Sequence, residues 1–310
     1  MLFSLCLFSQ WTYNGLSIVA PSNEIDSSHW SSALETNFNT ACLMPYAYMR
    51  NGSDVIFDHE RQYWGESDKG TREMVQQAKK LGLKVMLKPH LWIMPNTFTG
   101  TLTFENSERW KTWAASYRKY IYHFAEIAEE EKVELFCLAT EMESLWTEAP
   151  EEFEQLIDGV KKRYSGKLTY AANWDEYKRF PFWNQFDFIG VDAYFPLDKN
   201  HPTKSWNTIQ LEINAISDSL NVPIIFTEIG YRSIDDPFTK PWESYDNNTA
   251  NHTAQLKAYD AFFKTFIDDK HVAGAFIWKW FMGHFRQGEL STTFSPQGKP
   301  AEKLLRKYYK

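Results

Sequence analysis

The sequence has 310 residues and a formal net charge of −7, which disfavours the broad basic surface that nucleic-acid binding requires. Aromatic residues make up 17% of the chain, with 13 Trp and 16 Tyr, and their flat faces suit stacking on sugar rings as well as core packing. The three cysteines, Cys6, Cys42 and Cys137, are too few and too scattered for a disulfide framework or a zinc site.

The first nine residues are largely apolar and carry neither a basic segment nor a clear small-residue cleavage site. We expect residues 1–13 to be an N-terminal arm or the remnant of an export signal. An extracellular or periplasmic location is favoured, with the cytoplasm as the alternative. No stretch reaches about 18 apolar residues, so no membrane span is predicted.

Residues 14–310 are expected to form one domain, because no Pro-rich, Gly-rich or charged linker divides them. In chain order, the predicted strands, each with the helix expected after it in parentheses, are 14–21 (29–35), 41–48 (70–81), 83–90 (107–131), 133–140 (150–164), 166–173, 186–194 (205–220), 221–233 (251–268) and 272–280. This alternation predicts an α/β fold, a single (β/α)8 TIM barrel. Two doubly wound halves fit less well, because no Gly-rich phosphate turn is present.

Two glutamates stand at the ends of predicted strands. Glu228 interrupts the apolar run 221–233, and a carboxylate there is unfavourable unless it is paired or takes part in chemistry. Strict alternation groups Ile224, Phe226 and Glu228 on one face, and Leu135, Cys137, Ala139 and Glu141 on one face of the strand 133–140. Both acids would then lie at the C-terminal mouth of the barrel, where catalytic groups of this fold collect.

A pair of carboxylates at such a mouth suits glycoside hydrolysis, in which one protonates the leaving oxygen and the other attacks the anomeric carbon. Glu143 is a rival acid, but we expect it in a loop beyond the strand end. The alternative interpretation is structural, with both acids held by Lys or Arg.

Several segments in order resemble glycoside hydrolase family 113: residues 87–92, 139–141, 170–175, 189–197, 226–233 and 276–280. The resemblance extends from about Gly15 to about Trp280. It implies a retaining (β/α)8 hydrolase, chiefly an endo-β-1,4-mannanase, with Glu141 as general acid/base and Glu228 as nucleophile. The wider clan usually has Asn before the acid/base residue, where it contacts the sugar 2-hydroxyl, whereas this chain has Thr140.

The two acids need different protonation states. Glu228 must be ionised to attack, and the Tyr194 hydroxyl is a candidate to orient it, with core packing as the alternative role for Tyr194. Glu141 must hold a proton in the free enzyme, so we expect burial and the charge of Glu228 to raise its pKa.

Further candidates for substrate binding lie near the predicted strand ends. Trp278 is the candidate for the apolar floor beneath the sugar, with core packing as the alternative. Trp92, Trp174 and Trp280 are candidates for flanking subsites. Four polar residues are candidates to hydrogen-bond sugar hydroxyls: Lys88, His90, Asn173 and Asp192. For each of these four, the alternative is a solvated residue at the rim. Arg50 and Glu66, in the loop expected after the second strand, are further candidates to reach the mouth. No metal site is expected, since His90 has no close His or Cys companion.

The leading hypothesis is a cofactor-free hydrolase, most simply a monomer, that acts on β-mannan or manno-oligosaccharides. Its rivals are the same chemistry on β-glucan or xylan, exo-cleavage of manno-oligosaccharides, a non-catalytic carbohydrate-binding barrel, and a barrel with salt-bridged rim acids. The presence of both acids argues against the non-catalytic barrel.

Overall fold

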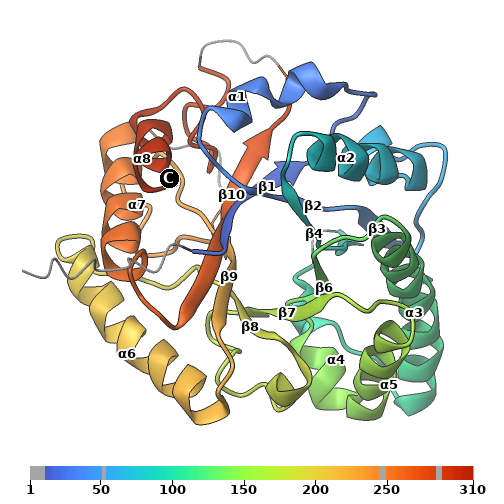
Figure 1. Cartoon of the computed structure of the whole chain (residues 1–310). Coiled ribbons are helices and arrows are strands. Elements are labelled where there is room, and N and C mark those ends of the chain that lie inside the picture. The colour runs from blue at the N-terminus through green and yellow to red at the C-terminus, as the bar shows by residue number, and fades with distance from the viewer. Residues whose placement is uncertain (1–10, 51–53, 96, 244–248, 284–287, 310) are drawn as a thin grey trace, which may run out of the picture.

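The computed structural model describes residues 11–50, 54–95, 97–243, 249–283 and 288–309. Within these ranges, eight parallel strands close into a barrel in the order β1-β10-β9-β8-β7-β6-β4-β2, with helices around it (Figure 1). The strands are β1 Tyr13–Val19, β2 Thr40–Leu43, β4 Lys84–Leu87, β6 Leu135–Thr140, β7 Lys167–Asn173, β8 Phe188–Asp192, β9 Ile224–Ile229 and β10 Val272–Phe281. The predicted (β/α)8 barrel is confirmed.

The helices of the outer layer are α1 Ser31–Leu34, α2 Asp68–Lys80, α3 Ser107–Glu130, α4 Glu143–Glu148, α5 Pro150–Lys161, α6 Pro202–Leu220, α7 His252–Phe266 and α8 Pro300–Tyr308. The sequence pattern predicts neither α4 nor α8. In α3, the side chain of Asn106 accepts a hydrogen bond from the Arg109 N–H at 3.0 Å and so caps the first turn. Trp113 and Tyr117, one turn apart, are both buried and stack with 5.1 Å between ring centroids.

The barrel interior is packed with side chains from all eight strands. Together with Met44, they form one buried cluster: Tyr13, Cys42, Met86, Leu135, Cys137, Ala171, Phe188, Ile225 and Phe276. A Cβ at Gly15 would lie 2.2 Å from the ring of Phe276, so glycine leaves the space that this ring fills. The filled interior confines any chemistry to the open end of the barrel.

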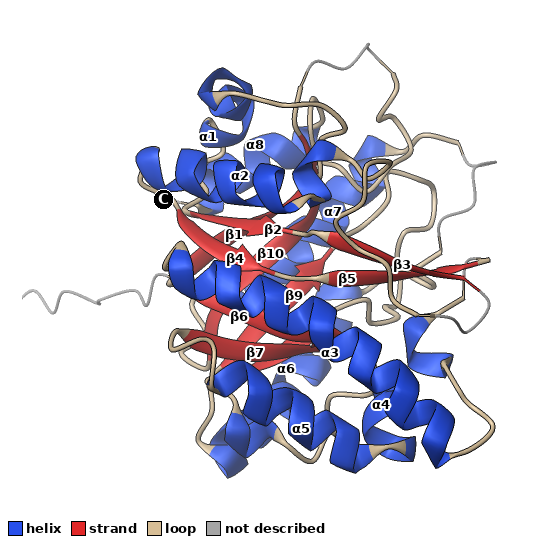
Figure 2. Cartoon of the chain, turned by 90° about the vertical axis from the view of Figure 1, so that its right-hand side faces the viewer, coloured by secondary structure: helices blue, strands red, loops and turns tan. Residues whose placement is uncertain are grey.

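Two predicted strands are each interrupted in the structure. The runs 41–48 and 83–90 break near Pro45 and Pro89, because proline cannot donate a ladder hydrogen bond. After each break the chain resumes as β3 Tyr46–Arg50 and β5 His90–Met94, which pair in parallel as a separate sheet. Figure 2 shows this pair reaching beyond the barrel strands. It forms a wall on one side of the mouth.

The predicted N-terminal arm lies mostly outside the described residues, which begin at Trp11. Trp11 is buried, and its Nε1 donates to the Phe266 carbonyl of α7 at 3.1 Å. Of the helices in the described ranges, none is long and apolar enough to cross a membrane.

Candidate active site

Glu228 reaches the barrel mouth because β9 is bulged. Ile225 packs in the interior cluster, while Phe226 packs outward against Phe262 and Phe266 of α7. Beside β8, the pair Val191–Phe226 is followed by Asp192–Glu228, so Thr227 is one extra residue on β9. The prediction that Ile224, Phe226 and Glu228 share a face is therefore wrong. The bulge reverses the alternation and turns the acid inward, as bulges beside active sites do.

A second irregularity precedes Glu141. Between β6 and β7 the register passes from Cys137–Thr169 to Thr140–Ala171, three residues against two. Leu135 and Cys137 face the interior as expected, but Ala139 belongs to the outer core, contrary to the prediction. Both acids thus depend on bulges that strict alternation does not anticipate.

The carboxylate of Glu228 is held by two donors from neighbouring strand ends. The Tyr194 hydroxyl, just after β8, donates to Oε2 at 2.7 Å, and the Lys88 ammonium, just after β4, contacts Oε1. This fixes the direction of the carboxylate from two sides, as a positioned nucleophile requires. Tyr194 therefore orients Glu228, one of the two roles considered for it.

Lys88 is shared between two buried carboxylates. Its Nζ lies 3.1 and 3.2 Å from the two carboxylate oxygens of Asp192, which also accepts from the Thr227 hydroxyl at 2.7 Å. Burial alone would lower the pKa of Lys88, but Asp192 and Glu228 together hold it above its usual value. Burial and the charge of Glu228 raise the pKa of Asp192 to about 7. The cluster carries one cation for two acids.

The structure corrects the roles expected for Lys88 and Asp192. Their side chains are 0% and 1% exposed, and each is already paired, Lys88 with Asp192 and Glu228, and Asp192 also with Thr227. Lys88 holds Glu228 in place, and Asp192 in turn holds Lys88. Sequence spacing placed both at strand ends but could not show that they face each other.

Replacing Lys88 by Met should destabilise the fold by about 3–5 kcal/mol at pH 8, because removing one partner leaves buried carboxylates without their cation. In the variant the folded-state pKa of Asp192 rises further above its unfolded value of about 3.9. The deficit should therefore be greatest above that raised pKa and shrink as the pH falls towards 4. Urea unfolding at pH 8 and pH 5 measures both values.

The matched control is Lys167→Met, which removes an exposed cation paired with Asp187 and should change stability by about 1 kcal/mol or less. Equal deficits for Lys88→Met at the two pH values would contradict the charge-sharing arrangement.

Glu141 follows β6 with φ of 51°, in the left-handed region, and its N–H donates to the Ala171 carbonyl at 2.7 Å. Burial raises its pKa well above the usual range, and the charges of Asp192 and Glu228 raise it further. The expected direction and causes of this shift agree with the structure. A carboxyl group in this environment keeps its proton and suits a general acid.

Glu143 is the first residue of α4, not a loop residue as predicted. Its carboxylate forms an ion pair with Arg179, whose side chain is 54% exposed. Because this acid faces a surface cation, Glu141 is the better candidate for the acid/base role.

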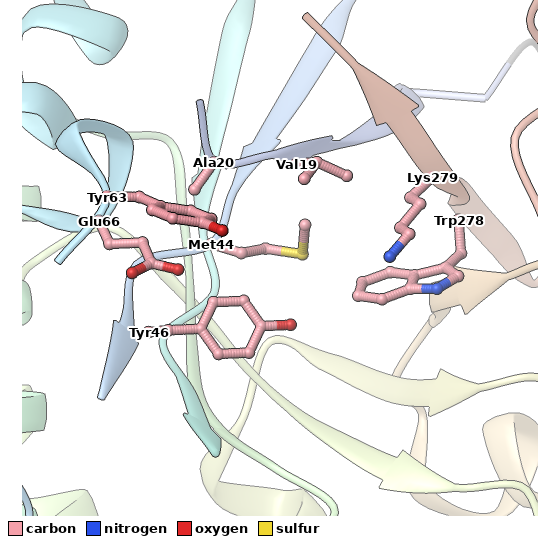
Figure 3. A pocket seen from close by; sticks show the side chains of 8 residues that line it. All are labelled: Val19, Ala20, Met44, Tyr46, Tyr63, Glu66, Trp278 and Lys279. Carbon is pink, nitrogen blue, oxygen red and sulfur yellow. The ribbon is translucent and has the colours of Figure 1, made fainter. Parts of the chain in front are cut away.

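A small pocket lies close to Glu228, whose charge acts on two of the lining residues, Tyr46 and Lys279. Sequence reasoning found only part of this pocket. Figure 3 shows Tyr46, Tyr63 and Glu66 on one side and Trp278 and Lys279 on the other; Val19, Ala20 and Met44 complete the lining. Glu66 is 4% exposed and accepts from the Tyr48 hydroxyl at 2.9 Å, and burial raises its pKa. Sequence reasoning did not single out Lys279. The available signal was its position directly after Trp278, in the segment 276–280 that carries the family resemblance.

His90 links this pocket to Glu228. Its ring stacks on Trp278 with centroids 5.9 Å apart, and its Nε2 lies 3.7 Å from Glu228 Oε1. Burial, with the charges of Lys88 and Lys279, lowers the pKa of His90 well below its usual value, so the ring is neutral. Among the described residues its buried Nε2 has no hydrogen-bond partner, and the same holds for the Thr140 hydroxyl.

The remaining candidates separate by exposure. Trp92 on β5 is 45% exposed, and Trp174 stacks on the exposed Trp242 with centroids 5.7 Å apart. Asn173, partly exposed at the end of β7, accepts from the Trp174 N–H at 2.7 Å. Arg50 is exposed at the end of β3. Trp280 is 1% exposed within the core, so its prediction as a subsite residue is wrong. Strict alternation would place it on the inward face with Phe276 and Trp278, but the register between β1 and β10 shifts from Leu16–Ile277 to Ile18–Trp280, and Trp280 packs in the outer core.

Comparison with known proteins gives one family. The sequence profile of Glycoside Hydrolase Family 113 matches residues 24–299. Among proteins with curated functions, no significant match was found.

Among solved structures, the GH113 β-mannanase AaManA from Alicyclobacillus acidocaldarius, in complex with ManMIm, is similar with a TM-score of 0.87 and 23% identity, covering 97% of this chain and 98% of that one. A complex of a GH113 β-1,4-mannanase has a TM-score of 0.85 at 22% identity, covering 96% and 99%. The β-glucuronidase of Ruminococcus gnavus has a TM-score of 0.68 at 14% identity, covering 97% of this chain and 50% of that one.

Proposed function

The chain belongs to glycoside hydrolase family 113, and from this premise we propose that it cleaves β-1,4-mannosidic bonds with net retention of anomeric configuration. The observation that carries the proposal is the unequal setting of two acids at one barrel mouth. Glu228 is oriented by Lys88 and Tyr194, whereas burial and neighbouring charges raise the pKa of Glu141. This is the division of labour that double displacement requires.

In the first step, a carboxylate oxygen of Glu228 attacks the anomeric carbon. The bond from that carbon to the leaving oxygen breaks, and Glu141 gives its proton to this oxygen. In the second step, the Glu141 carboxylate takes a proton from water, the water oxygen attacks the same carbon, and Glu228 is released. Two inversions give net retention.

Unpartnered polar atoms beside the acids support sugar binding. The buried Nε2 of His90 and the hydroxyl of Thr140 lack partners within the described residues, and buried polar groups normally have one. Hydroxyls of the bound sugar would supply them, above the face of Trp278. Thr140 would stand where the wider clan has Asn. Trp92, Trp174 and Asn173 would then serve flanking subsites.

The mannan assignment is supported by the family and by the similar fold of two β-mannanases. Initial rates of reducing-end release from β-mannan, β-glucan and xylan test it. We expect kcat/KM to be highest on β-mannan; a higher value on another polysaccharide would overturn the substrate.

The same enzyme tests the stereochemistry. Proton NMR during the first minutes of manno-oligosaccharide cleavage should show the β-anomer of the new reducing end, with the α-anomer appearing only as mutarotation proceeds. Initial appearance of the α-anomer would exclude retention and with it the role of Glu228 as nucleophile. The distribution of products also separates endo-cleavage from exo-cleavage.

A further inference from the structure

Glu176 is a buried acid in the turn after β7, and sequence reasoning assigned it no role. It is 1% exposed, and its oxygens accept three hydrogen bonds. Oε1 accepts from the Tyr170 hydroxyl at 2.5 Å and from Trp146 Nε1 at 2.6 Å, and Oε2 accepts from the Asn173 N–H at 3.0 Å. A carboxylate buried with neutral donors needs an explanation, since burial of charge is costly.

The contacts of Tyr170 lead from Glu176 to the general acid. The oxygen of the Tyr170 hydroxyl accepts a hydrogen bond from the Met142 N–H at 2.8 Å, and Met142 directly follows Glu141. The N–H of Glu141 itself donates to the Ala171 carbonyl. Both peptide groups that flank Glu141 are therefore held by β7.

This support falls on a residue that needs it. Glu141 has φ of 51°, a conformation that costs about 1–2 kcal/mol for a non-glycine residue and persists where surrounding contacts impose it. Without the Tyr170–Met142 hydrogen bond, the backbone at Glu141 can relax and carry the carboxyl group away from the position of the glycosidic oxygen.

We infer that Glu176 is a positioning residue for the general acid: it fixes the Tyr170 hydroxyl, which in turn fixes the backbone that aims Glu141. This inference rests on the proposed function of Glu141. Tyr170 belongs to the same device, and neither side chain reaches the substrate.

The charges around the pair determine the expected pH effect. Glu141 faces Asp192, Glu228 and Lys88 as well as Glu176. Glu176 in turn faces Tyr170 and Glu143, and the latter is paired with Arg179. Burial raises the pKa of Glu176 to about 7, so above this pH its charge adds to those that keep Glu141 protonated.

The test compares aryl β-mannosides with good and poor leaving groups. Loss of general acid catalysis slows the substrate with the poor leaving group, because only that leaving oxygen needs the proton. Tyr170→Phe deletes a single oxygen. For this variant we expect kcat/KM to fall about 10–100-fold on the phenyl mannoside and less than about 3-fold on the dinitrophenyl mannoside. The loss on the phenyl mannoside is smaller than the full contribution of general acid catalysis, about 10²–10⁴-fold, because Glu141 is still present.

Glu176→Gln should show the same selectivity and one additional effect. Removal of the negative charge lowers the pKa of Glu141, so the alkaline limb of kcat/KM moves to lower pH, whereas Tyr170→Phe keeps the charge and does not produce this downward movement. Should Glu176→Gln fail to fold, Tyr170→Phe decides on leaving-group selectivity alone.

Glu152→Gln is the matched control, since Glu152 is also buried, at 6% exposure, but pairs with Arg118 between α5 and α3. It should show no leaving-group selectivity. Equal slowing of both substrates by Tyr170→Phe, or no slowing, overturns the inference. Glu141→Ala, measured with the same two substrates, distinguishes failure of this inference from failure of the proposed function. If Glu141→Ala also shows no leaving-group selectivity, the proposed role of Glu141 as general acid is wrong.

Discussion

Glu228→Gln should fold normally and lose at least about 10⁴-fold in kcat on every β-mannoside, a loss of the size seen when a catalytic nucleophile is removed. A neutral amide cannot form the glycosyl-enzyme bond, whatever the leaving group. The fold should persist because Lys88 keeps Asp192 as its ionic partner. Steady-state rates and a thermal unfolding midpoint measured on the same preparation check both parts.

The sharpest control for this variant is the dinitrophenyl mannoside. Because nucleophile loss blocks the first step, a good leaving group should give no recovery of rate for Glu228→Gln. Near-normal activity, or activity restored by a good leaving group, would remove Glu228 from the nucleophile role.

Glu141→Ala should give the opposite dependence on the leaving group. With a dinitrophenyl mannoside, Glu228 can still be glycosylated, but the intermediate should accumulate because no base activates water. Added azide needs no base, so turnover should increase and β-mannosyl azide should form. On mannan and on phenyl mannoside the loss should be about 10²–10⁴-fold, the usual contribution of general acid catalysis. A pre-steady-state burst followed by azide titration measures these effects.

Glu143→Gln belongs in the same experiment, because it removes the rival acid and only a partly exposed ion pair with Arg179. It should keep activity within about 3-fold, as expected for a surface pair. If azide does not restore the activity of Glu141→Ala but does restore that of Glu143→Gln, then Glu143 and not Glu141 is the acid/base residue.

Much of the architecture was predictable because it depends on the pattern of apolar and polar residues within short segments. Short apolar runs alternating with helical segments imply a (β/α)8 barrel, and this alternation survives errors at element boundaries. The proline breaks near Pro45 and Pro89 carried a usable signal for the ends of β2 and β4. The pairing of β3 with β5 was not predictable from that signal, since it joins segments more than 40 residues apart.

The site was predictable by residue type and less so by role. Glu141, Glu228 and Trp278 stand out because an acid at the end of an apolar run, or an aromatic residue at a strand end, is locally unusual. Trp280 has the same local signature, but the direction of its side chain puts it in the core. Lys88 and Asp192 likewise stand at strand ends, yet 104 residues separate the two partners of their ion pair.

The order of the residues was thus enough to predict the barrel, to single out the two acids as candidates and to recognise the family, because each depends on short-range pattern or on motifs in sequence. Tertiary structure decided how the acids are aimed and charged. Bulges in β9 and before Glu141 shift the alternation by one position, and they are visible only in the register between neighbouring strands. The raised pKa of Glu141, the contact of Lys88 with Glu228 and the link from Glu176 through Tyr170 arise from groups brought together by closure of the barrel. Electrostatic interactions and burial depend on distance in space, which the linear sequence does not contain.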